Sequence, residues 1–309
     1  MFNFLTPMEF YQQEVLLPFK YDIAITSQAL DPRGEVSQFN AEKSSKRIIN
    51  ITYDHNELTL SINGVSVGLI DFLSQKSVFS SKSILFDATN LSFAEIAIVM
   101  RLAIKTMSIE RASFLYTEPE KYSAKVWSPL EARSFNLSNR INLVDFIPTF
   151  YQRSLSSKKN YLLAFLGFED IRLAKALDPD NGTSFDNVSI VFSIPPFQAG
   201  WETHALMANS RVLKEHVIEE SFFTAGNQPY DAYNLIEKVI STTKNGYNSN
   251  LTLAPFGTKP TSIAAALAAA KNEDISVLFD FPEKSINRSQ GVGKLHYYPI
   301  SISGSIKSG

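Results

Sequence analysis

The sequence predicts an α/β fold in which a doubly wound, mostly parallel sheet carries an appended N-terminal antiparallel β meander. From residue 83 onward, short apolar runs alternate with segments of helical periodicity, as in parallel strands joined by crossover helices. Between residues 20 and 80, β-rich runs are separated by short polar turns, which favours antiparallel pairing. We therefore expect residues 1–82 to form a β-rich layer and residues 83–309 to form one continuous α/β unit.

The meander is predicted from three runs, residues 47–53, 57–62 and 65–69. The last two runs are joined by Asn63-Gly64, the dipeptide most typical of a tight hairpin. Polar, serine-rich segments on either side of the three runs place the meander outside the central sheet.

The α/β unit is predicted from buried-strand patterns that alternate with helices. Residues 118–160 are less regular and contain several prolines, so we expect a connection or a second hairpin there. The helices are expected at residues 93–107, 169–177, 201–219, 230–244 and 260–271, and residues 295–302 close the sheet. The strands of the parallel core are expected at residues 84–88, 112–117, 161–166, 188–194, 250–254 and 275–281.

Composition limits the functional classes. The chain of 309 residues is 44% hydrophobic, which is enough for a substantial core, and its net charge of −2 argues against extended duplex nucleic acid as a partner. It contains no cysteine and four histidines without metal-binding spacing, so we expect neither a metal nor another cofactor. The N-terminus lacks a basic region and an unbroken apolar segment, which predicts a cytoplasmic protein with no membrane partner.

The sharpest candidate site follows the run at residues 250–254. Phe256 and Gly257 break this run, and an alanine-rich helix starts near Pro260. Gly257 permits close backbone approach to a ligand, Thr258 offers a hydroxyl, and Lys259 adds positive charge at a helix N-terminus, where phosphate binds well. The loop matches neither nucleotide-binding glycine motif in full, so a strand-ending Gly257 and a solvated Lys259 remain the alternative.

Two further strand ends carry comparable residues. Gly167 and Phe168 follow the predicted strand at 161–166, and Arg172 lies in the next helix, where it faces an anionic ligand or pairs with Glu169 at i,i+3. Trp201 follows the strand at 188–194 and either stacks on a base or packs against the core.

Asp87 and Thr89 lie at the carboxyl end of another predicted strand, where open α/β sheets bind ligands. The alternative for Thr89 and Asn90 is a helix cap. Residues 290–294, QGVGK, resemble a phosphate loop but precede a strand.

No nucleophile, carboxylate pair or metal cluster with defined spacing is recognisable, so the pattern favours ligand recognition over catalysis. If the protein is an enzyme, a transferase or hydrolase acting on a nucleotide or sugar-phosphate is the alternative, with Asp87, Glu169 or Glu202 as general base. A third possibility is a structural adaptor subunit with no ligand.

Residues 155–302 resemble the CRISPR-associated Rossmann-fold (CARF) and related SAVED sensor domains. The resemblance rests on LTLAPFGTKPTSIAAALAAAK at the strand, loop and helix, and on YLLAFLGFEDIR at an earlier strand and turn. It implies a sensor of cyclic or linear oligonucleotide second messengers in a prokaryotic defence or stress-response complex. Gly257, Thr258 and Lys259 would hold ligand phosphates, and Gly167 with Phe168 would line the opposite wall. No effector module is recognisable beside it, so a separate protein partner or a homo-oligomer is expected.

Overall fold

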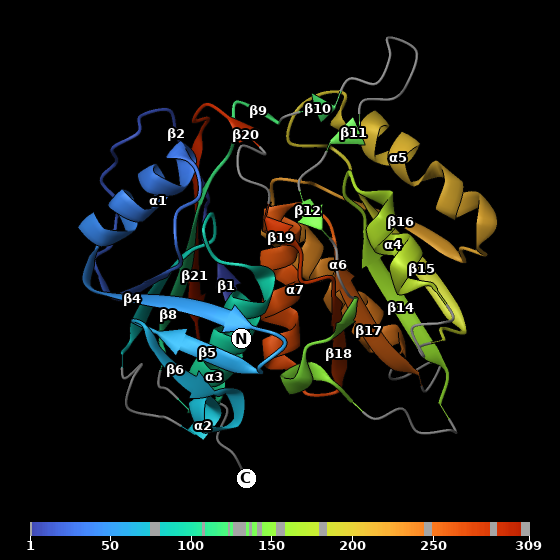
Figure 1. The fold of residues 1–309 in the computed structure, drawn as a ribbon, viewed down its shortest axis with the longest axis horizontal. Helices are drawn as coiled ribbons and strands as arrows, with labels where there is room; N and C mark the ends of the chain where they lie inside the picture. Colours follow the sequence, from blue (N-terminus) through green and yellow to red (C-terminus); the bar gives the residue numbers. More distant parts are fainter. Residues whose placement is uncertain are drawn as a thin grey trace. The chain divides into compact units, whose positions relative to one another are not determined.

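The computed structural model divides the chain into two compact units, which Figure 1 shows coloured along the sequence. Unit 1 comprises Met1–Tyr122 and Ser289–Gly309, and unit 2 comprises Ser123–Arg288. The predicted boundary at residue 82 lies inside unit 1, and the range predicted as one continuous unit is shared between both. The structure describes residues 2–74, 81–106, 109–122, 124–125, 134–135, 138–140, 144–152, 158–178, 184–243, 249–284 and 289–303.

Unit 1 is built on a mixed sheet with the strand order β1-β21-β8-β7-β3-β4-β5-β6, in which β2 also pairs with β21. Its helices are α1 (Pro32–Lys43), α2 (Leu69–Ser74) and α3 (Phe93–Thr106). The strands are β1 (Phe2–Phe4), β2 (Met8–Phe10), β3 (Tyr21–Thr26), β4 (Ser45–Asp54), β5 (Thr59–Ile62), β6 (Val65–Gly68), β7 (Ser83–Asp87), β8 (Arg111–Thr117) and β21 (Leu295–Ile302).

The predicted meander is partly wrong. Strand β4 pairs in parallel with β3, and β3 pairs in parallel with β7, so β4 belongs to the parallel part of the sheet. Only β5 and β6 extend it as antiparallel strands. The hairpin at Asn63-Gly64 is confirmed, because Ile62 pairs with Val65 and both turn residues have positive φ, 49° and 84°.

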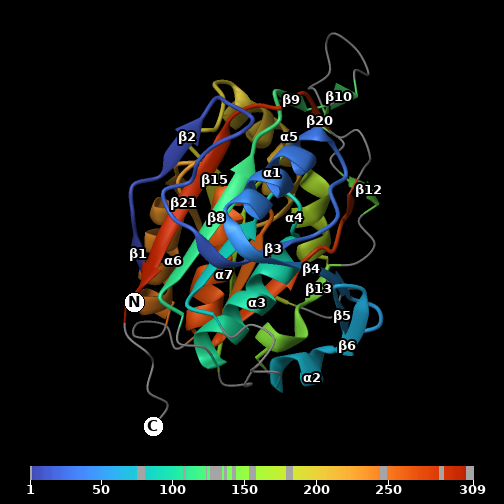
Figure 2. The same ribbon diagram turned by 90° about the vertical axis from the view of Figure 1, so that its left-hand side faces the viewer.

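Strand β3 and helix α1 were not predicted. Helix α1 has almost no apolar periodicity, yet it carries a start signal: the Asp31 side chain accepts a hydrogen bond from the Gly34 N–H, and Pro32 occupies the first turn. Strand β3 is a nearly continuous buried run without alternation, as expected between two parallel neighbours. Figure 2 shows red β21 running alongside green β8, to which it pairs antiparallel.

Unit 2 is built on a second sheet with the order β13-β18-β17-β14-β15-β16. All neighbours pair in parallel except β13, which is antiparallel to β18. The strands are β13 (Asp145–Phe146), β14 (Asn160–Phe165), β15 (Asn187–Ser193), β16 (Glu220–Thr224), β17 (Asn250–Pro255) and β18 (Ile275–Phe279). The helices are α4 (Asp170–Ala176), α5 (Trp201–Glu215), α6 (Pro229–Thr242) and α7 (Lys259–Lys271), with a 3-10 turn η1 (Pro148–Phe150).

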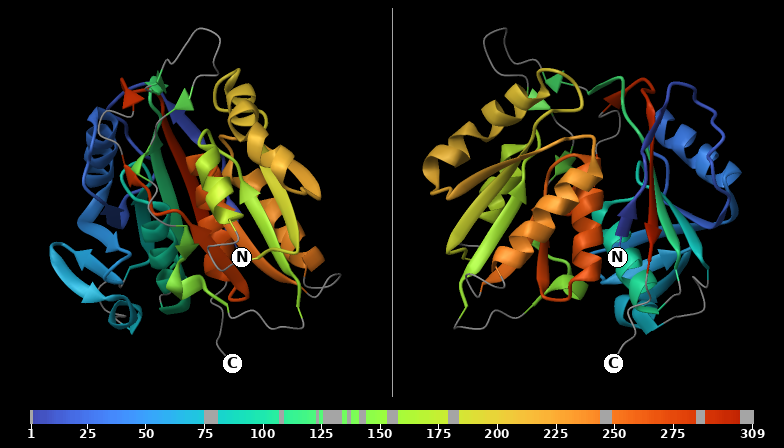
Figure 3. Two further views of the ribbon diagram at one scale, coloured as in Figure 1. Left: turned by 45° about the vertical axis from the view of Figure 1, so that its right-hand side comes forward. Right: turned by 180° about the vertical axis from the view of Figure 1, so that it is seen from behind.

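The helices of unit 2 pack in pairs, α4 beside α5 and α6 beside α7. Figure 3 shows the orange pair α6 and α7 side by side. Helix α7 is buried continuously from Pro260 to Ala270, and its small alanines permit this close packing.

The predicted parallel core is therefore not one sheet. Strands β7 and β8 lie in unit 1, whereas β14, β15, β17 and β18 lie in unit 2. The strand at the end of the chain, β21, completes unit 1 rather than the sheet of unit 2. Helix α5 ends at Glu215, four residues before the predicted end, because the chain then enters the unpredicted strand β16.

Short strands lie between residues 121 and 140 and between residues 283 and 290, near the two points where the chain passes from one unit to the other. Part of the predicted connection at residues 118–160 lies outside the described residues. Strand β9 pairs with β20, β10 with β11, and β12 with β19. Their bounds are β9 (Lys121–Tyr122), β10 (Ala124–Lys125), β11 (Ser134–Phe135), β12 (Ser138–Arg140), β19 (Glu283–Lys284) and β20 (Ser289–Gln290).

Across the described part of the chain, every helix is too short or too polar to cross a bilayer.

Candidate functional site

The candidate site of unit 2 lies where the strand order reverses. Strand β14 lies between β15, which follows it in the chain, and β17, which is reached only after β16. Gly167 follows β14 and Gly257 follows β17, so both predicted glycines lie at this reversal. A side chain at Gly167 would place its Cβ 2.4 Å from the Phe256 carbonyl oxygen. Glycine is therefore required for the close backbone approach between these two loops.

The loop after β17 is held firmly by its own contacts. Phe256 is buried, and a Cβ at Gly257 would lie 2.8 Å from the Thr261 hydroxyl. The Thr258 hydroxyl caps α7 by accepting from the Thr261 N–H at 3.5 Å, and it donates to the Gly226 carbonyl at 2.6 Å. That hydroxyl, predicted to contact a ligand, thus anchors the helix start. Lys259 is the first residue of α7 and is half-buried.

Arg172 is held between two carboxylates. Its Nη2 lies 2.7 Å from Glu169 Oε2, and its Nε lies 3.2 Å from Asp280 Oδ2. The pairing with Glu169 confirms the alternative considered from the sequence. Burial opposes the charge of Arg172, but the carboxylates of Asp280 and Glu169 outweigh it and raise the pKa of the guanidinium.

Asp280 was missed by the sequence analysis. It follows β18 directly, its side chain is 0% exposed, and burial raises the pKa of its carboxyl although the charge of Arg172 acts in the opposite direction. Among the described residues, neither of its oxygens receives a hydrogen bond of normal geometry. The signal in the sequence was an acidic residue at the end of the apolar run 275–279, the position at which open α/β sheets in general bind ligands.

Phe168 and Trp201 come together beside Gly167. Their rings meet edge to face with centroids 5.4 Å apart, and both residues are half-buried. The Asn209 side chain of α5 donates to the Gly167 carbonyl at 3.0 Å, which ties α5 to the same loop. Trp201 therefore packs on another predicted site residue.

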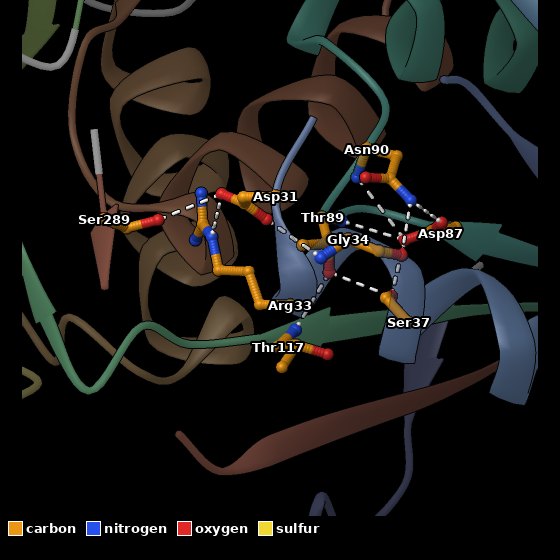
Figure 4. Close-up of polar contacts among 9 residues, drawn as sticks. All are labelled: Asp31, Arg33, Gly34, Ser37, Asp87, Thr89, Asn90, Thr117 and Ser289. Carbon is orange, nitrogen blue, oxygen red and sulfur yellow. Dashed lines mark hydrogen bonds and ion pairs between the residues drawn. The ribbon is translucent and has the colours of Figure 1, made fainter. Parts of the chain in front are cut away.

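In unit 1, Asp87 lies at the centre of a saturated polar network, most of which is drawn in Figure 4. The side chain is 0% exposed. Its Oδ2 accepts from the Thr26 hydroxyl at 2.7 Å and the Asn90 amide at 2.6 Å, and its Oδ1 accepts from the Ser37 hydroxyl at 2.5 Å. Burial raises the pKa of the Asp87 carboxyl, while these donors act in the opposite direction.

Thr89 and Asn90 belong to the same network and do not cap α3. The Thr89 hydroxyl donates to Ser37 at 2.9 Å and accepts from the Thr117 N–H, whereas the Asn90 amide also donates to the Gly34 carbonyl. The cap of α3 is a reciprocal pair, because Ser92 accepts from the Glu95 N–H and Glu95 accepts from the Ser92 N–H. Both the ligand hypothesis and the capping hypothesis thus overlooked a structural role for Thr89.

Beside this network, Figure 4 shows Asp31 bridging Arg33 and Ser289. Asp31 Oδ2 lies 2.9 Å from Arg33 Nε and accepts from the Ser289 hydroxyl at 2.9 Å. The pKa of Asp31 is lowered because Arg33 and the hydrogen-bond donors outweigh the effect of burial.

The phosphate-like run 290–294 has acidic surroundings. A Cβ at Gly293 would meet the Glu118 side chain at 2.7 Å, and a Cβ at Gly291 would meet the Glu120 carboxylate. Lys294 itself lies 2.9 Å from Glu9. This environment disfavours a phosphate.

Within the described residues, no cluster of three His, Asp or Glu side chains is arranged to hold a metal ion. Comparison with protein-family models gives no match to this chain, and comparison with curated proteins gives no significant match either.

The structure divides the predicted site residues into two groups. Asp87 and Thr89 lie in unit 1. The others lie at the carboxyl edge of the sheet in unit 2: Gly167, Phe168, Arg172, Trp201, Phe256, Gly257, Thr258 and Lys259.

Proposed function

We propose that the protein binds a nucleotide or another phosphate-bearing ligand at the carboxyl edge of unit 2 and acts as a sensor rather than as an enzyme. The observation that carries this proposal is the meeting of Gly167 with the Phe256–Gly257 backbone at the reversal of strand order. Open parallel sheets bind ligands at such reversals.

The strand order supports the finer description of unit 2 as a doubly wound, Rossmann-like fold. Its five parallel strands follow β16-β15-β14-β17-β18, which is the order 3-2-1-4-5 of that architecture. The similarity of the loop and helix to CARF and SAVED sensors supports an oligonucleotide second messenger as the ligand class. On the same resemblance, we propose a role in a prokaryotic defence or stress-response complex with a separate protein partner.

Binding is favoured over catalysis because two of the three carboxylates considered as bases, Asp87 and Glu169, are already engaged, whereas Glu202 has one buried oxygen without a hydrogen bond among the described residues. Asp87 is saturated by donors, and Glu169 is paired with Arg172. A general base requires a carboxylate free to reach the proton that it removes.

Lys259 provides the experimental test. Small molecules that co-purify with the protein are identified by mass spectrometry, and their affinity for the parent and for Lys259→Ala is measured by calorimetry. We expect affinity to fall about tenfold to a hundredfold, the effect of one charge-assisted hydrogen bond. The free energy of unfolding should change by less than about 0.5 kcal/mol, as for surface substitutions.

Two further variants sharpen this test. Lys271→Ala removes a lysine at the opposite end of α7, where it pairs with Glu237 at 2.7 Å, and should leave affinity unchanged. Gly257→Val should abolish binding, because a branched side chain obstructs the loop regardless of charge. Equal ligand affinity in Lys259→Ala and the parent protein would refute the phosphate site.

A further inference from the structure

Asp280 is a buried carboxylate with a poor supply of hydrogen-bond donors. Its side chain is 0% exposed, and neither oxygen receives a hydrogen bond of normal geometry from the described residues. Buried carboxylates are ordinarily paired and hydrogen-bonded, because an unsatisfied one costs several kcal/mol. Asp280 therefore lacks the hydrogen bonds that a purely structural buried carboxylate ordinarily has.

The arginine that pairs with Asp280 is shared with a second carboxylate. Arg172 Nε lies 3.2 Å from Asp280, whereas two of its nitrogens lie 2.7 and 2.9 Å from Glu169. Lys175 of α4 also acts on Asp280, but only through its charge. The guanidinium of Arg172 thus contacts two carboxylates, and its contacts to Glu169 are shorter than its contact to Asp280.

The position of Asp280 connects it to the proposed phosphate site. Strand β17 lies between β14 and β18, and Arg172 and Asp280 follow these two flanking strands. Their ion pair therefore joins the carboxyl ends on either side of β17, next to the loop that contains Gly257 and Lys259. Figure 1 shows β17 lying between β14 and β18.

We propose that Asp280 is a ligand-binding position that accepts hydrogen bonds from sugar hydroxyl groups of the phosphate-bearing ligand. This inference rests on the proposed function. A phosphate at the start of α7 places an attached sugar over the end of β17, and the sugar hydroxyls supply the donors that Asp280 lacks. Arg172, whose side chain is 14% exposed, covers the carboxylate and moves aside toward Glu169.

The binding test compares inorganic phosphate with ribose 5-phosphate by calorimetry on the full chain. We expect ribose 5-phosphate to bind the parent about tenfold tighter or more, and this preference to disappear in Asp280→Ala. Affinity for inorganic phosphate should not weaken in that variant, because no contact to phosphate is removed. A preference that persists in Asp280→Ala overturns the role of Asp280.

A matched variant separates the role of Asp280 from a general charge effect. Glu237→Gln neutralises a carboxylate that pairs with Lys271 at the far end of α7 and should retain the preference for ribose 5-phosphate. Loss of the preference in Glu237→Gln as well would overturn the assignment to Asp280. If inorganic phosphate itself shows no binding that depends on Lys259, the proposed function fails and this inference fails with it. Phosphate binding without a preference for the sugar defeats only the inference.

Thermal unfolding provides a second readout, independent of any ligand. Asp280→Asn removes a buried charge that lacks donors, so its melting temperature should equal or exceed that of the parent protein. A residue kept for structure gives the opposite result. A melting temperature clearly below the parent value would identify Asp280 as structural and refute the proposal.

Discussion

Asp87 is the last residue of the parallel strand β7, and Asp280 directly follows the parallel strand β18. Both are fully buried, but their surroundings differ. In unit 1, Asp87 receives hydrogen bonds from Thr26, Ser37 and Asn90. In unit 2, Asp280 receives none of normal geometry and relies on a shared arginine. Burial raises the pKa of both carboxyls, so the pKa direction alone does not distinguish them. The number of hydrogen-bond donors does distinguish them, because Asp87 is satisfied within the fold and Asp280 is not.

The largest expected effect comes from removing the saturated carboxylate. Asp87→Ala leaves the donors of Thr26, Ser37 and Asn90 buried without their acceptor, and we expect it to cost about 3–5 kcal/mol of the free energy of unfolding. Asp280→Ala is the matched substitution and should cost much less, because Arg172 loses one contact but keeps its pair with Glu169. Urea unfolding measures both. Equal costs would erase the distinction between the two sites.

A smaller effect is expected at the glycine contact of unit 2. Gly167→Ala places a Cβ 2.4 Å from a backbone oxygen of Phe256, which cannot move without displacing the end of β17. We expect a loss of about 1–3 kcal/mol, as in other overpacked sites. Gly68→Ala is the control, since its Cβ makes an ordinary 3.5 Å contact with Asp71. If Gly167→Ala unfolds at the same urea concentration as the parent, the two loops are not in tight contact.

The smallest effects concern pH and have opposite signs at two aspartates. The pKa of Asp280 is raised from 3.8, so its contribution to stability is complete below that value and is lost as pH rises through the folded pKa. The pKa of Asp22 is lowered to about 2, first by the hydrogen bond from Lys46, so its contribution is present above 3.8 and is lost as pH falls toward 2.

Melting temperatures between about pH 3 and about pH 8 test these signs. The advantage of Asp280→Asn over the parent should grow as pH rises, whereas the deficit of Asp22→Asn should shrink as pH falls. The same pH trend in both variants would contradict the assignment of a raised pKa to one aspartate and a lowered pKa to the other.

The sequence predicted most elements of unit 2 because strongly apolar strands alternate there with helices. The sequence did not predict how the strands divide between two sheets. Strands β7 and β14 have equally buried patterns, and a strand's local sequence does not indicate which sheet it joins. Strand β16 was not predicted because it lacks the pattern of a buried strand. Four of its five residues are exposed or only partly buried, Glu220 and Phe223 among the exposed ones.

The candidate site was predictable in its backbone but not in its charges. Gly167 and Gly257 were found because glycine after a buried strand has a specific conformational meaning. Asp280 and the shared pairing of Arg172 were not predicted, because an ion pair between residues so far apart in the sequence depends on tertiary structure. Thr89 was misjudged for the same reason, since its partners Ser37 and Thr117 come from other strands and helices.

The pairing of β21 with β8 affects the order in which the chain can fold during synthesis. Strand β21 lies between β8 and β1, so β1 cannot pair in the sheet until β21 has been synthesised. At about 5–20 residues per second, the ribosome needs on the order of ten to forty seconds to pass from β8 to β21. Throughout that interval the edge of strand β8 that later pairs with β21 has no partner, and by its end every strand of the unit 2 sheet has been synthesised. The nascent chain therefore finishes its second unit before its first, and the edge of β8 is where a chaperone would be needed.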